Sequence, residues 1–177
     1  MNLTLYLPPS AATSKSAPLL IYLSGLTCSP DNVTEKGFLH SHASSLGLAL
    51  LYPDTSPRGL DLPGEHESWD FGSAASFYID ATTKPWNKNY KMESYLTKEL
   101  PDLLFGAFKE LDSSRGTEDN IYKQGQLLPE NFAKVAEEIG ASDLQVNYRE
   151  GYDHSYFFIS TFAGDHVQHA AKALGLL

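Results

Sequence analysis

Two short apolar runs on either side of a helical segment constrain the fold more than any other feature of the sequence. Residues 19–23 and 48–52 are continuously apolar, as expected for parallel strands that are buried on both faces. Residues 31–45 are predicted to form a helix between them, with Asp31 at its start and Gly47 just beyond its end. A strand, a helix and a strand in this order form a βαβ unit, whose right-handed crossover implies a parallel sheet. We therefore expect an α/β fold with a parallel sheet and helices on both faces.

The remaining segments extend this pattern along the chain. Residues 3–7 alternate and stop at Pro8, which predicts a short strand, and residues 10–17 are predicted to form a loop. Apolar residues recur at helical spacing over residues 90–108, where Pro101 requires a kink or an early helix boundary. The later elements are predicted to be a helix, a strand and a helix, over residues 129–140, 144–148 and 155–174.

Residues 53–89 show no periodicity and are rich in Pro, Gly, Asp, Ser and Trp. A loop of this length in a compact domain is usually functional. Its two tryptophans, Trp69 and Trp86, line an acyl pocket in one interpretation and close the domain in the other. The sequence does not decide between them.

Composition narrows the class of protein and its partners. A chain of 177 residues with 42% hydrophobic residues is typical of one globular domain. The net charge of -9 argues against nucleic acid and anionic membranes as partners. Cys28 is the single cysteine, which excludes an intrachain disulfide, and no N-terminal signal is recognisable, so we predict a cytoplasmic protein.

A histidine lies on the short turn between the last predicted strand and the last predicted helix. An α/β-hydrolase has its general base, here His154, at this position near the C-terminus. That fold supplies its catalytic triad in the order nucleophile, acid and histidine, and a candidate acid, Asp119, lies upstream. No Gly-x-Ser-x-Gly motif, which marks the turn carrying the nucleophilic serine, occurs anywhere in the chain.

Five runs of residues, spread over nearly the whole chain, resemble S-formylglutathione hydrolase, also called esterase D. They are residues 23–28 (LSGLTC), 53–59 (PDTSPRG), 68–72 (SWDFG), 125–132 (GQLLPENF) and 150–156 (EGYDHSY). The resemblance implies a cytosolic serine thioesterase that releases formate and glutathione in formaldehyde detoxification. It also implies cleavage of simple carboxylic esters and a homodimer. We predict no cofactor and no metal.

The chain departs from this family in two places. It begins where the second or third strand of the family would begin, so we expect the N-terminal strands to be missing. Residues 111–115 run directly into residues 116–120. The family has a long segment between these two pieces, with the nucleophile elbow, the helix after it, a cap region and the strand leading to the acid. We predict a single α/β-hydrolase-type domain over residues 1–177, with an internal deletion at about residues 115–116.

The resemblance assigns roles to four residues. His154 is the general base and Asp119 is the acid that orients it. Leu26 follows a buried strand, where this fold takes one backbone N–H of the oxyanion hole; the second donor would follow the nucleophile and is absent. Cys28 resembles the thiol beside the family's active site.

Each role has a structural alternative. Asp119 is otherwise a solvated turn carboxylate, easily confused with Glu118 or Asp112, and Cys28 is otherwise a small buried hydrophobe. Asp153 is interpreted as a turn former. Three polar residues of the last helix are interpreted as solvated side chains rather than a metal site: Asp165, His166 and His169.

Three functions remain open. The chain is an active hydrolase in which Ser24, Ser155 or Cys28 replaces the serine, an inactive relative that binds a ligand or dimerises, or a misassembled gene product. If the family geometry persists, Asp119 accepts a hydrogen bond from His154 at about 2.6–3.2 Å. Without the elbow strand, we expect residues 144–148 to pair beside residues 19–23, because an apolar strand with an unpaired edge invites aggregation.

Overall fold

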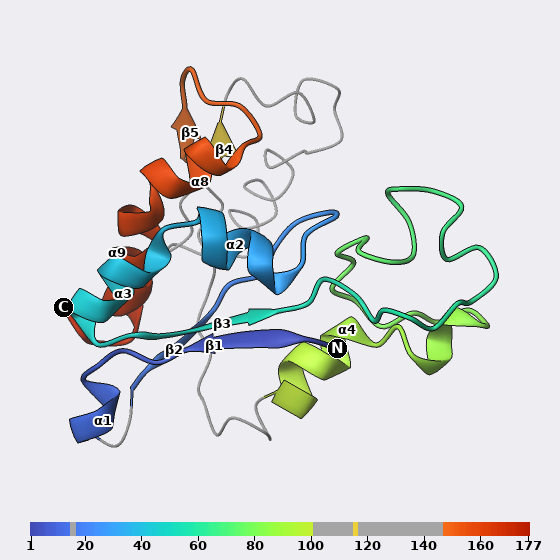
Figure 1. Cartoon of the computed structure of the whole chain (residues 1–177), viewed down its shortest axis with the longest axis horizontal. Coiled ribbons are helices and arrows are strands. Elements are labelled where there is room, and N and C mark those ends of the chain that lie inside the picture. Colours follow the sequence, from blue (N-terminus) through green and yellow to red (C-terminus); the bar gives the residue numbers. More distant parts are fainter. Residues whose placement is uncertain (15–16, 101–114, 117–146) are drawn as a thin grey trace, which may run out of the picture. The chain divides into compact units, whose positions relative to one another are not determined.

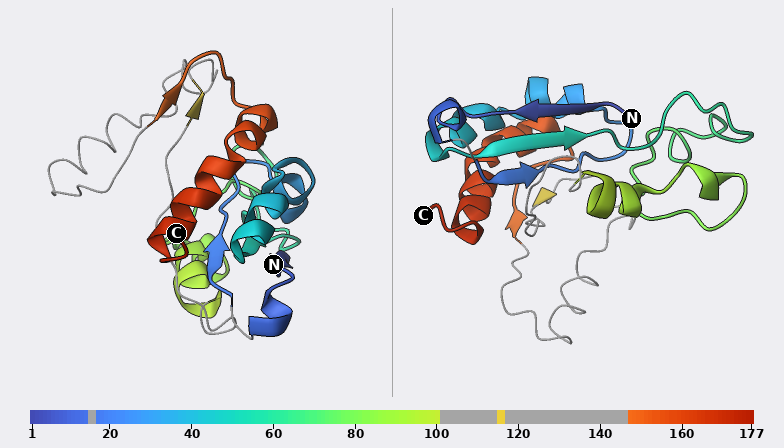
Figure 2. Two further views of the ribbon diagram at one scale, coloured as in Figure 1. Left: turned by 90° about the vertical axis from the view of Figure 1, so that its left-hand side faces the viewer. Right: turned by 90° about the horizontal axis from the view of Figure 1, so that it is seen from below.

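The first of two structural units, Met1–Phe108, is built on a three-stranded sheet (Figure 1). The computed structural model describes residues 1–14, 17–100, 115–116 and 147–177. The strands are β1 (Leu3–Tyr6), β2 (Leu19–Ile21) and β3 (Ala49–Pro53), in the order β1-β3-β2. The views in Figure 2 show them side by side. The central strand β3 is buried at every position, as its apolar run predicts.

The predicted βαβ unit is confirmed, but the sheet is mixed. Strands β2 and β3 are parallel, with Leu20 opposite Leu50. Strand β1 runs antiparallel to β3 and alternates between exposed and half-buried positions. An antiparallel edge strand on a parallel sheet is common in α/β folds, because only the strands joined by a crossover helix must be parallel.

The predicted helix over residues 31–45 forms as two helices, α2 (Pro30–Lys36) and α3 (Leu39–Leu46). Between them, Phe38 has a left-handed φ of 53°. The residue that caps the start of α2 is Ser29 rather than Asp31, and the Ser29 N–H donates to Asn32 Oδ1 at 2.8 Å. Gly47 ends α3 with a φ of 68°, as predicted. A short helix, α1 (Ala11–Ser14), occupies part of the segment predicted to be a loop.

Helical segments cover both faces of the sheet within this unit. Helices α2 and α3 contact β3, and the ring of His40 stacks on Tyr6 with centroids 4.4 Å apart. On the opposite face, Ile21 and Leu51 pack with Leu100, next to the π-helical turn η2 (Tyr95–Glu99). The predicted fold class, with helices on both faces of the sheet, therefore holds for the first unit.

The helix predicted over residues 90–108 begins as α4 (Met92–Ser94) and continues into η2. Its first turn is held by Asp80, whose carboxylate accepts the N–H of Ser94 at 2.9 Å and also the Ser94 hydroxyl. Residues 101–108 lie outside the described residues. No helix among those that the structure describes has the length and apolar character needed to span a bilayer.

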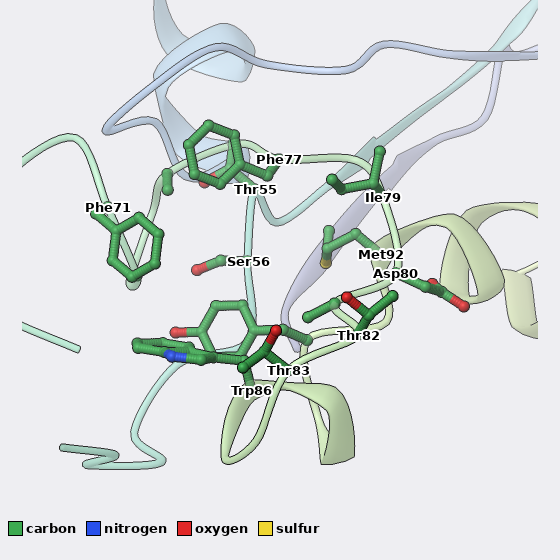
Figure 3. A pocket seen from close by; sticks show the side chains of 14 residues that line it. Thr55, Ser56, Phe71, Phe77, Ile79, Asp80, Thr82, Thr83, Trp86 and Met92 are labelled. Atoms are coloured by element: carbon green, nitrogen blue, oxygen red, sulfur yellow. The ribbon is translucent and has the colours of Figure 1, made fainter. Parts of the chain in front are cut away.

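The long loop between β3 and α4 folds back on itself and contains the 3-10 helix η1 (Trp86–Lys88). Glu65 is buried at its centre, where its carboxylate accepts the Leu62 N–H at 2.9 Å and the Tyr90 hydroxyl. Burial acts to raise the pKa of Glu65, but these hydrogen bonds outweigh it and hold that pKa below its usual value. Trp86 lines a cavity in this loop (Figure 3), whereas Trp69 is 66% exposed.

In the second unit, Lys109–Leu177, the described residues form a two-stranded parallel sheet and two helices. Strand β4 (Arg115–Gly116) pairs with β5 (Tyr148–Arg149). The predicted helix over residues 155–174 forms as α8 (Tyr156–Thr161) and α9 (Ala163–Ala173), separated at Phe162. The Phe162 ring packs edge-on against Tyr152 and lies under the Arg149 guanidinium, 4.4 Å from its centroid. This contact keeps Phe162 at the junction of the two helices.

The predicted pairing of residues 144–148 with β2 is wrong for Tyr148, which pairs with Arg115 instead. The end of the strand that precedes Asp119 is retained as β4, and it supplies a parallel partner for β5. Within the described residues, β2 pairs with β3 alone. Residues 144–146 and the predicted helix over residues 129–140 lie outside the described residues.

We expect Gly72→Ala to destabilise the protein far more than Gly59→Ala. Both glycines have a left-handed φ, of 77° and 71°. A Cβ at residue 72 would lie 2.3 Å from the Glu65 carbonyl oxygen, whereas a Cβ at residue 59 would meet nothing within 4 Å. The left-handed conformation alone costs about 1–2 kcal/mol for alanine. The clash should raise the loss to about 3 kcal/mol or more for Gly72→Ala. Urea denaturation measures both, and equal losses would contradict the close packing of Gly72.

A second prediction concerns the pH dependence of stability. His40 is half-buried, its Nε2 has no hydrogen-bond partner within the described residues, and burial lowers its pKa. In the unfolded chain His40 therefore takes up a proton near pH 6.5, whereas in the folded chain it takes up the proton only at a lower pH. This contribution to stability is fully present above about pH 6.5 and is lost as the pH falls toward the lowered pKa of the folded state. His40→Phe keeps a ring against Tyr6 and should flatten this part of the curve of unfolding free energy against pH. A slope unchanged by His40→Phe would contradict the assignment.

Candidate functional site

The loop after β2, residues 24–28, carries two of the predicted site residues, Leu26 and Cys28. Thr27 has a left-handed φ of 66°, and its N–H donates to the Ala74 carbonyl at 2.8 Å. A non-glycine residue in this conformation costs free energy and persists only where its surroundings hold it. The hydrogen bond from Thr27 to Ala74 therefore fixes residues 24–28 against the long loop that follows β3.

The backbone N–H of Leu26 donates to no described residue, although the next two amides are engaged. The Thr27 N–H donates to Ala74, and the Cys28 N–H donates to the Gly25 carbonyl at 3.2 Å. Most backbone N–H groups in folded proteins are paired, so an unpaired one directly before two engaged amides is notable. A donor held in this way can bind a developing oxyanion without reorganising.

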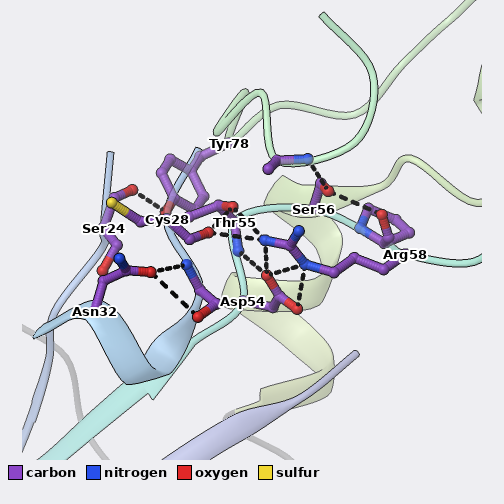
Figure 4. Close-up of polar contacts among 11 residues, drawn as sticks. Ser24, Cys28, Asn32, Asp54, Thr55, Ser56, Arg58 and Tyr78 are labelled. Carbon is purple, nitrogen blue, oxygen red and sulfur yellow. Dashed lines mark hydrogen bonds and ion pairs between the residues drawn. The ribbon is translucent and has the colours of Figure 1, made fainter. Parts of the chain in front are cut away.

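An ion pair at the end of β3 holds the other side of this loop (Figure 4). Asp54 is only 1% exposed, and its two carboxylate oxygens accept the Nε–H of Arg58 at 2.9 Å each. The Cys28 carbonyl accepts from Arg58 Nη2 at 2.8 Å and from the Thr55 hydroxyl at 2.6 Å. The ion pair thus fixes the Cys28 carbonyl, two residues after Leu26.

Residues 53–59 are part of the family resemblance, but the sequence alone assigns no role to Asp54 or Arg58. The signal was a carboxylate directly after a buried strand, followed four residues later by an arginine. A carboxylate at such a position is buried with the end of the strand and needs a cationic partner.

Two tyrosines lie against the same loop. The Tyr78 hydroxyl donates to the Ser24 carbonyl, and burial raises the Tyr78 pKa above its usual value. Burial, followed by the charge of the nearby Cys28, raises the pKa of Tyr22 to about 12. Both phenols therefore remain neutral at physiological pH. Cys28 itself is half-buried, which fits both interpretations of this residue.

In the second unit, His154 lies exposed on the turn between β5 and α8, as predicted. On that turn the Ser155 hydroxyl donates to the Asp153 carboxylate, consistent with Asp153 as a turn former. Strands β4 and β5 are parallel, so their carboxyl ends meet at one edge of the sheet. The segments that lead to Asp119 and His154 leave from that edge. Asp119 lies outside the described residues, and its hydrogen bond to His154 stays a prediction.

Among the described residues, three groups that ligate metals come together: Asp61, Glu65 and His66. Both Glu65 oxygens already accept hydrogen bonds, and His66 Nε2 lies 3.6 Å from Asp61 Oδ1. This is the geometry of a surface ion pair. On α9, the Asp165 carboxylate is 60% exposed and accepts from Arg149 Nη2 at 3.3 Å, a surface contact in keeping with the solvated interpretation.

Comparisons with known proteins identify the family. The "Putative esterase" family model matches residues 1–117. S-formylglutathione hydrolase of Bos taurus is 36% identical to this chain, over 98% of this chain and 89% of the relative. S-formylglutathione hydrolase of Rattus norvegicus is 33% identical, with the same coverage. The chain belongs to the S-formylglutathione hydrolase family.

A solved structure supports the fold of this family member. The structure, of an S-formylglutathione hydrolase from Agrobacterium tumefaciens, matches with a TM-score of 0.83 at 29% identity. The match covers 96% of this chain and 88% of the solved chain. The predicted α/β-hydrolase fold class and the predicted family are both confirmed.

The length of these matches is informative. The alignment to the bovine S-formylglutathione hydrolase is 255 residues long, whereas 98% of this chain is about 173 residues. Roughly 80 aligned positions of the relative therefore have no counterpart in this family member. The family-model match ends at residue 117, close to the junction predicted at residues 115–116.

We expect Arg58→Ala to cost about 3 kcal/mol of unfolding free energy, because it leaves the buried Asp54 carboxylate without its cation. Arg58→Lys is the matched control: it keeps the charge but cannot donate to two oxygens in a fixed fork, so its loss should be smaller. Urea denaturation measures both variants. A loss for Arg58→Ala below about 1 kcal/mol, the value typical of surface pairs, would contradict this role for the pair.

Proposed function

We propose that this chain is a hydrolase of the S-formylglutathione type that retains the acid, the base and one oxyanion donor but has no nucleophile. Its site would consist of Asp119, His154 and the Leu26 N–H, directed at a small thioester such as S-formylglutathione or at a simple carboxylic ester. Alone, it would not hydrolyse these compounds at an enzymatic rate. We place it in the cytoplasm, in formaldehyde detoxification, as a homodimer without metal or cofactor.

The observation that carries the proposal is the parallel pairing of β4 with β5. Gly116 ends β4 three residues before Asp119, and Arg149 ends β5 five residues before His154. Because both strands run in the same direction, both segments start at one edge of the sheet. Catalytic residues of open α/β sheets gather at the carboxyl ends of the strands. This arrangement supports the assignment of Asp119 as the acid partner of His154.

The loop after β2, residues 24–28, supports the same proposal from the first unit. The Leu26 N–H is unpaired among the described residues, and the neighbouring amide of Thr27 is anchored to Ala74. An oxyanion hole needs donors that are already oriented before the charge develops. In this proposal the Leu26 N–H is one donor, while the second would belong to the residue after the serine.

The missing nucleophile is proposed to reflect an internal deletion. The chain has no Gly-x-Ser-x-Gly motif, and the alignment to the bovine relative contains roughly 80 unmatched positions. A deletion at about residues 115–116 would remove the elbow and leave β4 as the remainder of the strand that leads to the acid. The 1–177 chain would then be one truncated α/β-hydrolase-type domain.

An assay with S-formylglutathione and 4-nitrophenyl acetate tests the function. Loss of the serine costs about a million-fold in kcat in a comparable protease triad. General-base catalysis by His154 toward water would restore about a hundred- to ten-thousand-fold over the uncatalysed reaction. We therefore expect turnover far below the usual range of about 1–1000 per second, with a further loss in His154→Ala.

A kcat within that range, abolished by His154→Ala, would contradict the proposal and show that another residue attacks the substrate. Ser24→Ala, Ser155→Ala and Cys28→Ala would then identify it. Asp119→Asn is the companion variant. If Asp119 orients His154, it should lower the residual rate and shift its pH profile, whereas Asp112→Asn should change neither.

A further inference from the structure

The long loop of the first unit surrounds a cavity of about 350 Å³, and among the described residues of this unit neither Leu26 nor Cys28 lines it. Its walls come from the end of β3, the middle of the loop and the start of α4. Most of the lining side chains are aromatic or aliphatic; the larger ones are Phe71, Phe77, Ile79, Trp86, Tyr90 and Met92. Figure 3 shows Phe77 on one side of the space, Trp86 on the opposite side and Phe71 between them.

The aromatic wall is fixed by contacts among its own rings. Phe71 lies edge-on to Trp86, with centroids 5.1 Å apart, and Trp86 lies edge-on to Tyr90 at 4.9 Å. The Tyr90 hydroxyl is anchored on buried Glu65. Rings held edge to face around a space leave flat apolar surfaces for a further planar group.

Part of the rim of the cavity is apolar and open to solvent. Phe71, Phe77 and Ile79 are 47%, 52% and 66% exposed. Three large apolar side chains grouped at the mouth of an apolar cavity differ from the isolated exposed residues that are normal on a protein surface. A hydrophobic molecule in the cavity would remove this surface from water.

The polar groups of the wall indicate the charge of the ligand. Within the part of the chain that the structure describes, no lysine, arginine or histidine lines the cavity. The Ser56 hydroxyl is occupied, since it donates to the Pro57 carbonyl and accepts the Ala74 N–H at 2.7 Å. Asp80, the acidic residue of the lining, is bound by Ser94. An anion would therefore find no cationic partner here, in a chain that already carries a net charge of -9.

We propose that this cavity is a binding site for an uncharged hydrophobic molecule that carries an aromatic system of about naphthyl size. A dry apolar cavity of about 150 Å³ holds benzene, and ligand pockets generally begin near 300 Å³. A space of about 350 Å³ with three aromatic walls suits a fused or linked pair of rings. Among the described residues, none of residues 24–28 lines this cavity, although Thr55 contacts both the cavity and the Cys28 carbonyl. Binding there does not require hydrolysis, so the proposal holds whether or not the chain turns over thioesters.

The test uses the full chain with Trp69→Phe, which leaves Trp86 as its single tryptophan. The probe is N-phenyl-1-naphthylamine, a neutral dye that becomes fluorescent in apolar surroundings. We expect saturable binding of one dye per chain, with energy transfer from Trp86. The matched anion is 8-anilino-1-naphthalenesulfonate, which has the same ring system and should bind at least about tenfold more weakly, a difference of about 1.4 kcal/mol.

Two variants in the Trp69→Phe background locate the dye. Ala75→Leu fills the cavity from a buried position of its wall and should weaken binding at least about tenfold. Phe77→Ala removes an exposed rim side chain and should weaken binding about fivefold without loss of fold, as checked by circular dichroism. Leu7→Ala is the control, because Leu7 is 60% exposed and lies outside the cavity.

Three results would overturn the proposal: binding of the dye that does not saturate, equal affinity for the neutral dye and its sulfonate, or an affinity that Phe77→Ala leaves unchanged in a folded protein. A loss of affinity in Leu7→Ala as large as in Phe77→Ala would also overturn it, because binding would then follow general surface hydrophobicity.

Discussion

The first unit depends on the ion pair between the buried Asp54 carboxylate and the exposed Arg58 side chain. A carboxylate that is 1% exposed requires a cation and further donors, and Arg58 and the Thr55 N–H supply them. The second amino group of Arg58 donates to the Cys28 carbonyl. Arg58 thus neutralises the Asp54 carboxylate, which is buried directly after β3, and also fixes the loop after β2. One electrostatic requirement thereby sets the position of the Leu26 amide.

The parts of the fold that the sequence predicted are those with strong local patterns. Strands β2 and β3 are continuous apolar runs, and Gly47 marks a helix end that needs a left-handed residue. The helix breaks at Phe38 and Phe162 were missed, because apolar spacing continues across both positions. What interrupts these helices is tertiary: Phe162, for example, is fixed by Tyr152 and Arg149. Periodicity carries no information about such contacts.

The candidate site shows the same division. Leu26 and His154 lie on the predicted loops, because each directly follows a recognisable strand. The role of Arg58 was missed, since its Nη2 donates across 30 positions of the chain to Cys28. The pairing of β4 with β5 was missed because strands of two residues have no measurable alternation. Motif resemblance suggested the candidate site residues, whereas the contacts that hold the Leu26 loop are visible only in the structure.

Each retained part of the site is held by its own neighbours rather than by the nucleophile. The Leu26 loop is anchored by Ala74, Arg58 and Tyr78, and the His154 turn follows a strand paired with β4. Local anchoring of this kind would allow a family geometry to persist without the nucleophile, as we propose for this chain. Triad residues act as a unit, so the loss of one member removes most of the rate even when the others remain in place. Intact loops are therefore a sign of ancestry and fold, while activity depends on whether an atom is present to attack the carbonyl.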